Sequence, residues 1–555
     1  MKCFPHAVVY LALVVINWLS PVAIPAAEPK LIAHYPLTDD AQDHSGHGHD
    51  GTIHGVKFGV EAGYSSAEFD GKSAWIGLPQ GVLPTNGDFS VGVRVFVRSP
   101  TGDVPGDILS QYDPKTRRGI QLGLHTAAGV TSSQSLYRNV EFGIDNGSQP
   151  GEWADHGRLG NAVLIYSLAV HNGSLFAGTC EAGVEQAGRV FRFDGTKWHD
   201  LGAPDRCNSV SSLAVYNVEL YAGVSRYRLA GSALAESDNP NMGGRVYRWQ
   251  PPNKWVDCGQ LPETEAINGM AVFQGKLYAS SMYAPAGFFR YEGGTEWTSC
   301  GTPDGKRVEA LGVFNDHIYA TGYDQGAVYR FDGKTWEHLG ILPEATQTYG
   351  FAVYRGELYV SEWPNARVYR FGGVQKGTAK WELVGQFGEE KESMPLIVYN
   401  GQMYGGSLPM GEVYRFDGGQ DWAKVARLDM TPDVKFRRVW SMAVYDGRLF
   451  AGTLPAGRVH SVEIGHVATH DSALLPGWHH LAAVRDNGRL MLYVDGELTS
   501  ESTPFAADLD VSSKAPLQVG FGPRDYFQGR LQDLRFYDGA LSVDAVRALH
   551  NPSQK

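Results

Sequence analysis

Residues 167–179 read SLAVHNGSLFAGT, and variants of this phrase return six more times along the chain. Each copy joins two short, alternating apolar runs through a turn that usually contains Asn-Gly, Asp-Gly or another glycine, a strong signal for a β-hairpin. The copies are anchored by valines 40 to 46 residues apart, with one longer interval: Val170, Val215, Val272, Val313, Val353, Val398 and Val444. This spacing indicates a repeat protein.

A second hairpin follows most copies, as in GAVYRFDGKTWEHLG at 326–340. Four short strands in a unit of about 40 residues are typical of a β-propeller blade, in which neighbouring blades bury each other's faces. The seven copies therefore predict a seven-bladed β-propeller. Its turn and aromatic pattern resembles that of kelch-type propellers.

One strand of the predicted ring is out of place. A tryptophan begins the fourth strand after each of the first six copies, but the seventh copy ends at GRVHSVEIG (457–465) without one. A matching tryptophan, Trp153, occurs in GEWADHGRLG (151–160), before the first copy. We therefore predict that residues 151–160 complete the seventh blade, so that the ring closes without an open sheet edge.

The flanking sequences lack the repeat and alternate as sandwich strands do. Shared motifs are DHSGHGHDG (43–51), FDG (69–71), WHHLAAVRD (478–486), LYVDG (492–496) and GRLQDLRFY (529–537). Together they resemble the laminin G-like, concanavalin A-like jelly roll. The predicted fold is thus all-β, a concanavalin A-like jelly-roll sandwich interrupted by a seven-bladed β-propeller.

The expected division of the chain follows from this interruption. The expected parts are a signal peptide at 1–27, the first half of the sandwich at 28–147, the propeller at 148–465 and the second half of the sandwich at 466–555. An inserted domain needs its two ends close together, which closure within one blade provides. We expect the sandwich to lie against the face that carries the turns of the repeated hairpins, here called the first-hairpin turns. The opposite face is then open.

The N-terminal apolar run from Ala7 to Leu19, followed by Ala26 and Ala27, predicts an export signal cleaved near Ala27. The mature protein is expected to be secreted, periplasmic or on the cell surface, without a membrane span. A net charge of −12 and the absence of a Lys/Arg run argue against nucleic acid as a partner.

Removing the leader leaves Cys180, Cys207, Cys258 and Cys300. Cys180 and Cys207 are expected on the same face and are the candidate disulfide, although four buried free thiols fit the sequence equally well. Cys258 and Cys300 lie on diverging outer strands, where no bridge is expected.

The open face is expected to carry the ligand site, because its irregular loops contain aromatic and arginine side chains suited to stacking on and hydrogen bonding a sugar or a peptide. The alternative is that these rings only pack between blades. The candidate ligand-binding residues are Tyr227, Tyr283, Tyr323, Trp363, Arg307, Arg437 and Trp440.

The jelly-roll resemblance implies a structural calcium ion, with Asp43 and Asp533 as candidate ligands if the first and last strands pair. Histidines in DHSGHGHDGTIH (43–54) are a weaker alternative as zinc ligands, because their glycine spacing gives them no common focus.

The sequence contains no HExxH, G-x-S-x-G, P-loop or CxxC motif, and no catalytic residue is predicted. The favoured function is a non-catalytic protein that recognises glycans or other extracellular partners. One alternative is a polysaccharide hydrolase or lyase whose paired carboxylates, such as Glu265 and Glu309, face each other in the propeller funnel. Another is a structural surface protein.

Overall fold

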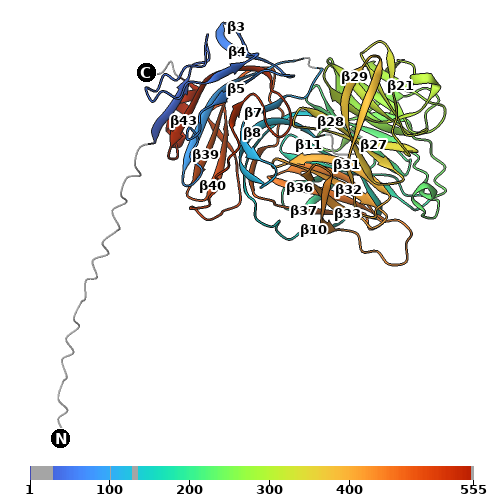
Figure 1. The fold of residues 1–555 in the computed structure, drawn as a ribbon. Helices are drawn as coiled ribbons and strands as arrows, with labels where there is room; N and C mark the ends of the chain where they lie inside the picture. The colour runs from blue at the N-terminus through green and yellow to red at the C-terminus, as the bar shows by residue number, and fades with distance from the viewer. Residues whose placement is uncertain (2–28, 100–101, 128–134, 552–555) are drawn as a thin grey trace.

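The computed structural model describes Met1 and residues 29–99, 102–127 and 135–551, so the predicted leader and Cys3 lie outside the described residues. The regular secondary structure of the chain is almost entirely β-strand, as predicted. Figure 1 shows the first strands (blue) and the last strands (red) interleaved in one body, and the strands between them in a second body. In the part of the chain that the structure describes, no helix is long and apolar enough to cross a membrane.

The first body consists of two antiparallel sheets. One has the order β3 (Lys57–Glu61), β4 (Tyr64–Asp70), β43 (Gln528–Asp538), β6 (Phe89–Val97), β39 (Gly477–Asp486), β40 (Arg489–Val494) and β41 (Glu497–Glu501), with β1 (Lys30–Tyr35) also on β43. The other has the order β2 (Thr52–His54), β5 (Trp75–Leu78), β42 (Leu517–Val519), β7 (Gly106–Asp113), β8 (Arg118–Ala127), β9 (Ser135–Asn146) and β38 (His466–His470).

Both sheets mix strands from the two ends of the sequence, which is what a split sandwich requires. Their apolar inner faces form one core that includes Phe89 and Phe142 from the first flank and Leu481 and Phe536 from the second. At the split, His466 on β38 pairs with Ile144 on β9, so the chain leaves and re-enters the sandwich on adjacent strands. The helix α1 (Val543–His550) buries Val546 in a small cluster beside β39 and β40.

The repeats form a propeller-like arrangement with five four-stranded sheets. The third and fourth repeats form the sheets β19 (Ile267–Phe273), β20 (Lys276–Ser281), β21 (Phe288–Gly293) and β22 (Glu296–Ser299), and β23 (Val308–Phe314), β24 (His317–Gly322), β25 (Ala327–Phe331) and β26 (Trp336–Ile341). The fifth and sixth form β27 (Gln347–Tyr354), β28 (Glu357–Trp363), β29 (Arg367–Gln375) and β30 (Thr378–Gln386), and β31 (Glu392–Tyr399), β32 (Gln402–Leu408), β33 (Glu412–Gly418) and β34 (Asp421–Arg427). The last sheet combines β35 (Arg438–Tyr445), β36 (Arg448–Leu454) and β37 (Arg458–Val462) of the seventh repeat with β10 (Ala154–Arg158), which precedes the first repeat.

The first two repeats share one eight-stranded sheet. It contains β11 (Ala162–His171), β12 (Ser174–Glu181), β13 (Val190–Phe193), β14 (Trp198–Asp200), β15 (Ser209–Tyr216), β16 (Glu219–Ser225), β17 (Arg245–Gln250) and β18 (Lys254–Gln260). A single pair, Cys180 with Ser209, joins β12 to β15. Two short 3₁₀ turns, η1 (Leu229–Ser232) and η2 (Pro303–Gly305), lie in loops.

The strand that precedes the first repeat pairs with the last one. Ala154 and Asp155 on β10 face Ser461 and His460 on β37. Trp153, immediately before β10, packs against the large buried core that spans the neighbouring repeats. The early tryptophan of the sequence therefore lies beside the outermost strand of the last repeat, where the repeat pattern placed it.

The first-hairpin turns contact the sandwich, which confirms the predicted orientation. Asn400, in the turn between β31 and β32, donates its side-chain amide to the carbonyls of Ile144 (3.0 Å) and Ile464 (2.8 Å). The backbone amides of Arg355 and Asp316 donate to Pro523 and Gly102 of the sandwich, at 2.8 and 2.9 Å.

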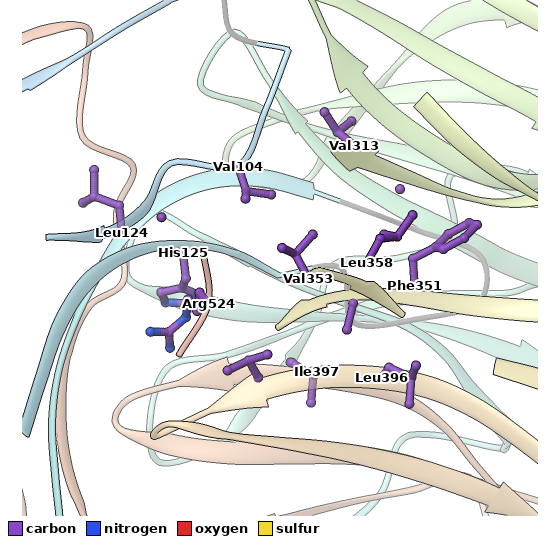
Figure 2. A pocket seen from close by; sticks show the side chains of 14 residues that line it. Val104, Leu124, His125, Val313, Phe351, Val353, Leu358, Leu396, Ile397 and Arg524 are labelled. Carbon is purple, nitrogen blue, oxygen red and sulfur yellow. The ribbon is translucent and has the colours of Figure 1, made fainter. Parts of the chain in front are cut away.

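A cavity of about 50 Å³ lies at this joint (Figure 2). Val104, Leu124, His125 and Arg524 approach it from the sandwich, and Val353 is one of the propeller side chains on its other side. This volume admits one or two water molecules but no organic ligand. The cavity belongs to the packing between the two bodies.

Candidate functional site

A larger cavity of about 470 Å³ opens on the face of the propeller away from the sandwich. Its volume is in the range of small-molecule sites, roughly 300–1,000 Å³. Seven aromatic side chains line it: Tyr227, Tyr283, Tyr323, Tyr349, Trp363, Phe436 and Trp440.

Much of this lining comes from the inner strands, where the lining residues occupy two fixed positions of the repeat. Side chains six and four residues before an anchoring valine lie on the same side of a strand, because alternate residues share a face. Arg307, Gln347, Glu392 and Arg438 are six residues before their valines, and Glu309, Tyr349 and Trp440 are four residues before theirs. The irregular loops add Tyr227, Tyr283, Tyr323 and Phe436, and the end of β28 adds Trp363.

Six of the seven predicted ligand-binding residues meet in this cavity: Tyr227, Tyr283, Tyr323, Trp363, Arg307 and Trp440. The seventh, Arg437, does not line it. Its guanidinium donates to the carbonyls of Thr431 (2.6 Å) and Val434 (3.3 Å) in its own loop. Because Arg438 and Trp440 share a face of the chain, Arg437 points the other way and Arg438 takes its place.

Three charged side chains are buried in the cavity wall: Glu309, Glu392 and Arg438 are 4%, 1% and 6% exposed. Arg438 donates from Nη2 to Oε2 of Glu392 at 3.3 Å. Within the described part of the chain, four buried atoms of the wall have no hydrogen-bond partner: Oε2 of Glu309, Oε1 of Glu392, Nε of Arg438 and Nε1 of Trp440. Buried polar atoms are ordinarily satisfied, so the concentration of four such atoms in one wall marks it as a candidate site of polar contact with a bound molecule.

The two carboxyls differ in their surroundings. Burial raises the pKa of Glu309 to about 8, and the negative charge of Glu392 acts in the same direction. Burial also raises the pKa of Glu392, but the adjacent Arg438 opposes that effect. At neutral pH Glu309 is therefore mainly a protonated donor, whereas the arginine favours the carboxylate form of Glu392.

Three arginines lie against aromatic rings at the cavity. The guanidinium carbon is 4.3 Å from the Tyr283 ring for Arg228, 4.2 Å from the Tyr323 ring for Arg307 and 5.2 Å from the Trp440 ring for Arg438. Each arginine also has an acidic partner: Glu265, Asp324 and Glu392, respectively. These paired contacts fix the rings and leave little net charge at the rim.

The carboxylate pair expected from the sequence is replaced by another. Glu265 is held by Arg226 at 3.1 Å and by Arg228, and it does not line the cavity. Glu392 is the second carboxyl beside Glu309. Glu392 was not among the predicted site residues, although its six-residue spacing from Val398 is a signal in the sequence for this position.

The candidate disulfide is absent from the structure, in which Cys180 and Cys207 are free and buried. The strand ladder places Cys180 opposite Ser209, two residues beyond Cys207. The thiol of Cys207 instead donates to the carbonyl of Ser209 at 3.7 Å. Cys258 and Cys300 are also free thiols.

The residues proposed for calcium take part in hydrogen bonds within the sandwich. β1 and β43 pair as expected, but both oxygens of Asp43 already accept two hydrogen bonds each, from the amides of His34, Ser45 and His49 and from the Ser45 hydroxyl. Oδ1 of Asp533 accepts from His34 and Arg535, both at 2.8 Å. Among the described residues, no group of three or more His, Cys, Asp or Glu side chains is placed to hold a metal ion, the glycine-spaced histidines included.

Comparison with protein families matches residues 446–547 to a family described as the concanavalin A-like lectin/glucanases superfamily, Laminin_G_3. The matched stretch covers most of the second half of the sandwich and agrees with the resemblance found in the sequence. Comparison with curated proteins gives no match.

Comparison with solved structures finds virginiamycin B lyase from Staphylococcus aureus, with a TM-score of 0.46 and 9% identity over 56% of this chain and 99% of that one. A putative gluconolactonase has a TM-score of 0.31 and 17% identity over 44% of this chain and 84% of that one. We infer no activity from likenesses this distant.

Proposed function

We propose that this protein binds a glycan in the aromatic cavity of the propeller. The observation that carries the proposal is that Glu309, Glu392, Arg438 and Trp440, each with an unpartnered buried atom, line a cavity of about 470 Å³. An apolar pocket with a few convergent polar groups is the usual form of a small-molecule site.

The chemistry of the wall suits a neutral sugar. A sugar hydroxyl both donates and accepts hydrogen bonds, and this wall offers both partners. Donors are Nε of Arg438, Nε1 of Trp440 and the protonated carboxyl of Glu309, and an acceptor is Oε1 of Glu392. The exposed parts of Tyr323, Trp363 and Phe436 supply ring faces for the C–H surface of a pyranose.

The wider assignment joins this site to the rest of the chain. We infer seven blades, counting the eight-stranded sheet as two four-stranded meanders joined by one residue pair. The propeller of residues 148–465, kelch-like in its turns, then interrupts a sandwich formed by 28–147 and 466–555. An exported binding protein, with the leader at 1–27 removed, suits both the laminin G-like sandwich and a glycan site.

A hydrolase is the second candidate, because Glu309 and Glu392 are carboxyls in different environments within one cavity. In that case protonated Glu309 would give its proton to the leaving oxygen while Glu392 takes one from the attacking water. Release of new reducing ends from a bound glycan, abolished in Glu309→Gln, would favour the hydrolase over the binding protein.

The binding proposal is tested by calorimetry with a panel of short neutral oligosaccharides, using two tryptophan variants. Trp363→Ala removes a ring that lines the cavity and should weaken binding about tenfold. Trp381→Ala removes a partly buried ring from β30 of the same sheet, outside the cavity, and should leave affinity unchanged. Failure of the whole panel to bind, or equal losses in both variants, would refute the proposal.

A further inference from the structure

The loop between β16 and β17, residues 226–244, is the long insertion of the repeat pattern. It reaches the open face of the propeller and lines the cavity with Tyr227, Arg228, Ala230, Gly231 and Glu236. The other lining residues come from position 282 onward. In the described chain, no residue of the first repeat lines the cavity, so the insertion forms the wall on that side.

The insertion is anchored along its length. Ser232 accepts a 2.7 Å hydrogen bond from Nη1 of Arg438, which belongs to β35 of the last repeat. Leu229 is 0% exposed and packs in the apolar cluster under the cavity. Asn208 exchanges hydrogen bonds with the backbone of Tyr227 at 2.7 and 2.9 Å.

The far end of the insertion is anchored as well. The amide of Asn239 donates to the carbonyls of Gln186 and Arg206, both at 3.1 Å. Oε1 of Glu236 accepts from the backbone amide of Leu229 at 2.8 Å. A segment tied to the ring at both ends and at its centre is a fixed wall and not a mobile lid.

The floor of the cavity is closed. Tyr166 is fully buried, packs edge-on against Trp440 at 4.9 Å and donates to the sulfur of Met282 at 3.9 Å. Met394 and Leu164 belong to the same buried cluster. With buried side chains beneath it and walls from both the inner strands and the insertion, the cavity is a recess that opens on the propeller face away from the sandwich.

From this shape we infer that the cavity receives the end of a glycan chain and not an interior segment; this rests on the proposed glycan function. An interior segment would have to bend into the recess and out again through the same face, whereas a chain end can enter it without bending. The insertion is thus the element that determines specificity for chain ends.

The test uses the wild-type protein and calorimetry. The probes are short linear malto-, cello-, xylo- and manno-oligosaccharides, the same sugars reduced with borohydride or blocked at the non-reducing end, and the cyclic α-1,4-glucan. Blocking one end should weaken binding at least about tenfold, blocking the other should have little effect, and the cyclic sugar should not bind.

A variant supplies an independent readout. Replacing residues 229–236 by a short Gly-Ser linker removes the wall, and binding of interior segments or of the cyclic glucan should appear. If the sugars blocked at either end and the cyclic glucan bind the wild type as well as the open sugars do, the chain-end inference is wrong and the glycan function stands. If no sugar binds, both fail.

Discussion

Arg438 and Ser232 are joined by a 2.7 Å hydrogen bond between Nη1 and Oγ, although 206 residues separate them in the chain. The same guanidinium is paired with Glu392 and lies against Trp440. One arginine thus connects the insertion, two inner strands and the aromatic lining of the cavity.

Replacing this arginine should be costly. Arg438→Met leaves Glu392 buried without a counter-ion, and we expect the free energy of unfolding to fall by about 3 kcal/mol. Urea denaturation at neutral pH measures the change. Arg245→Met is the matched control, because it breaks an exposed pair with Asp257 and should cost less than about 1 kcal/mol. Equal losses would contradict the buried-pair assignment.

The stability of the protein should depend on the titration of Glu309. Its pKa of about 8 in the folded protein is above the ordinary value of 4.5, so the folded state holds a proton that the unfolded state has lost between these pH values. The stabilising effect is therefore fully present below about pH 4 and declines as the pH rises to about 8.

Glu309→Gln removes this dependence. From pH 5 to pH 8 we expect the wild type to lose about 2–4 kcal/mol more of its unfolding free energy than the variant does. Glu263→Gln, at an exposed carboxyl, is the control and should follow the wild type. Parallel pH profiles for wild type and Glu309→Gln would refute the prediction.

The joint between sandwich and propeller should depend on Asn400. Asn400→Ala leaves the carbonyls of Ile144 and Ile464 without their donor and should reduce the free energy of unfolding by about 3 kcal/mol. Asn172 occupies the same turn position in the first repeat with a similar positive φ, 45° against 42°, and its side chain is exposed. Asn172→Ala should therefore measure only the free energy of unfolding that is lost when alanine must adopt this positive φ. Thermal unfolding of both variants separates the two effects.

The closing strand gives a further prediction. Trp153→Ala should destabilise the protein by about 2 kcal/mol, below the roughly 3–5 kcal/mol of a fully buried aromatic ring, because Trp153 is partly exposed. Trp198 packs against the same core from β14, and its replacement should cost a similar amount. A negligible loss for Trp153→Ala beside a clear loss for Trp198→Ala would mean that the closing strand adds little.

Much of the fold follows from local patterns in the sequence. Turn residues and period-2 alternation identify hairpins, and the displaced Trp153 identifies the strand that pairs with β37. These signals are local or repeat at a fixed interval, so they can be recognised in the sequence without knowledge of the tertiary structure.

The site was predictable in part. Its aromatic rings could be found because the propeller topology sends one set of loops to the open face. The choice between Arg437 and Arg438 depends on which residue of an alternating pair faces inward, and register at a strand end is not set by composition. The spacing of Glu392 from Val398 places it among the lining positions, but its burial beside Arg438 is a contact between neighbouring repeats that no local pattern shows.

The pairing of β9 with β38 also determines how the molecule would respond to being stretched. Lys30 faces Asp538 on paired antiparallel strands, so a pull applied at these two residues would peel β1 from β43 one rung after another. The inserted propeller does not carry this force, because β9 and β38, the strands on which the chain leaves and re-enters the sandwich, pair directly with each other. Under tension the sandwich should therefore unfold first, while the propeller stays folded.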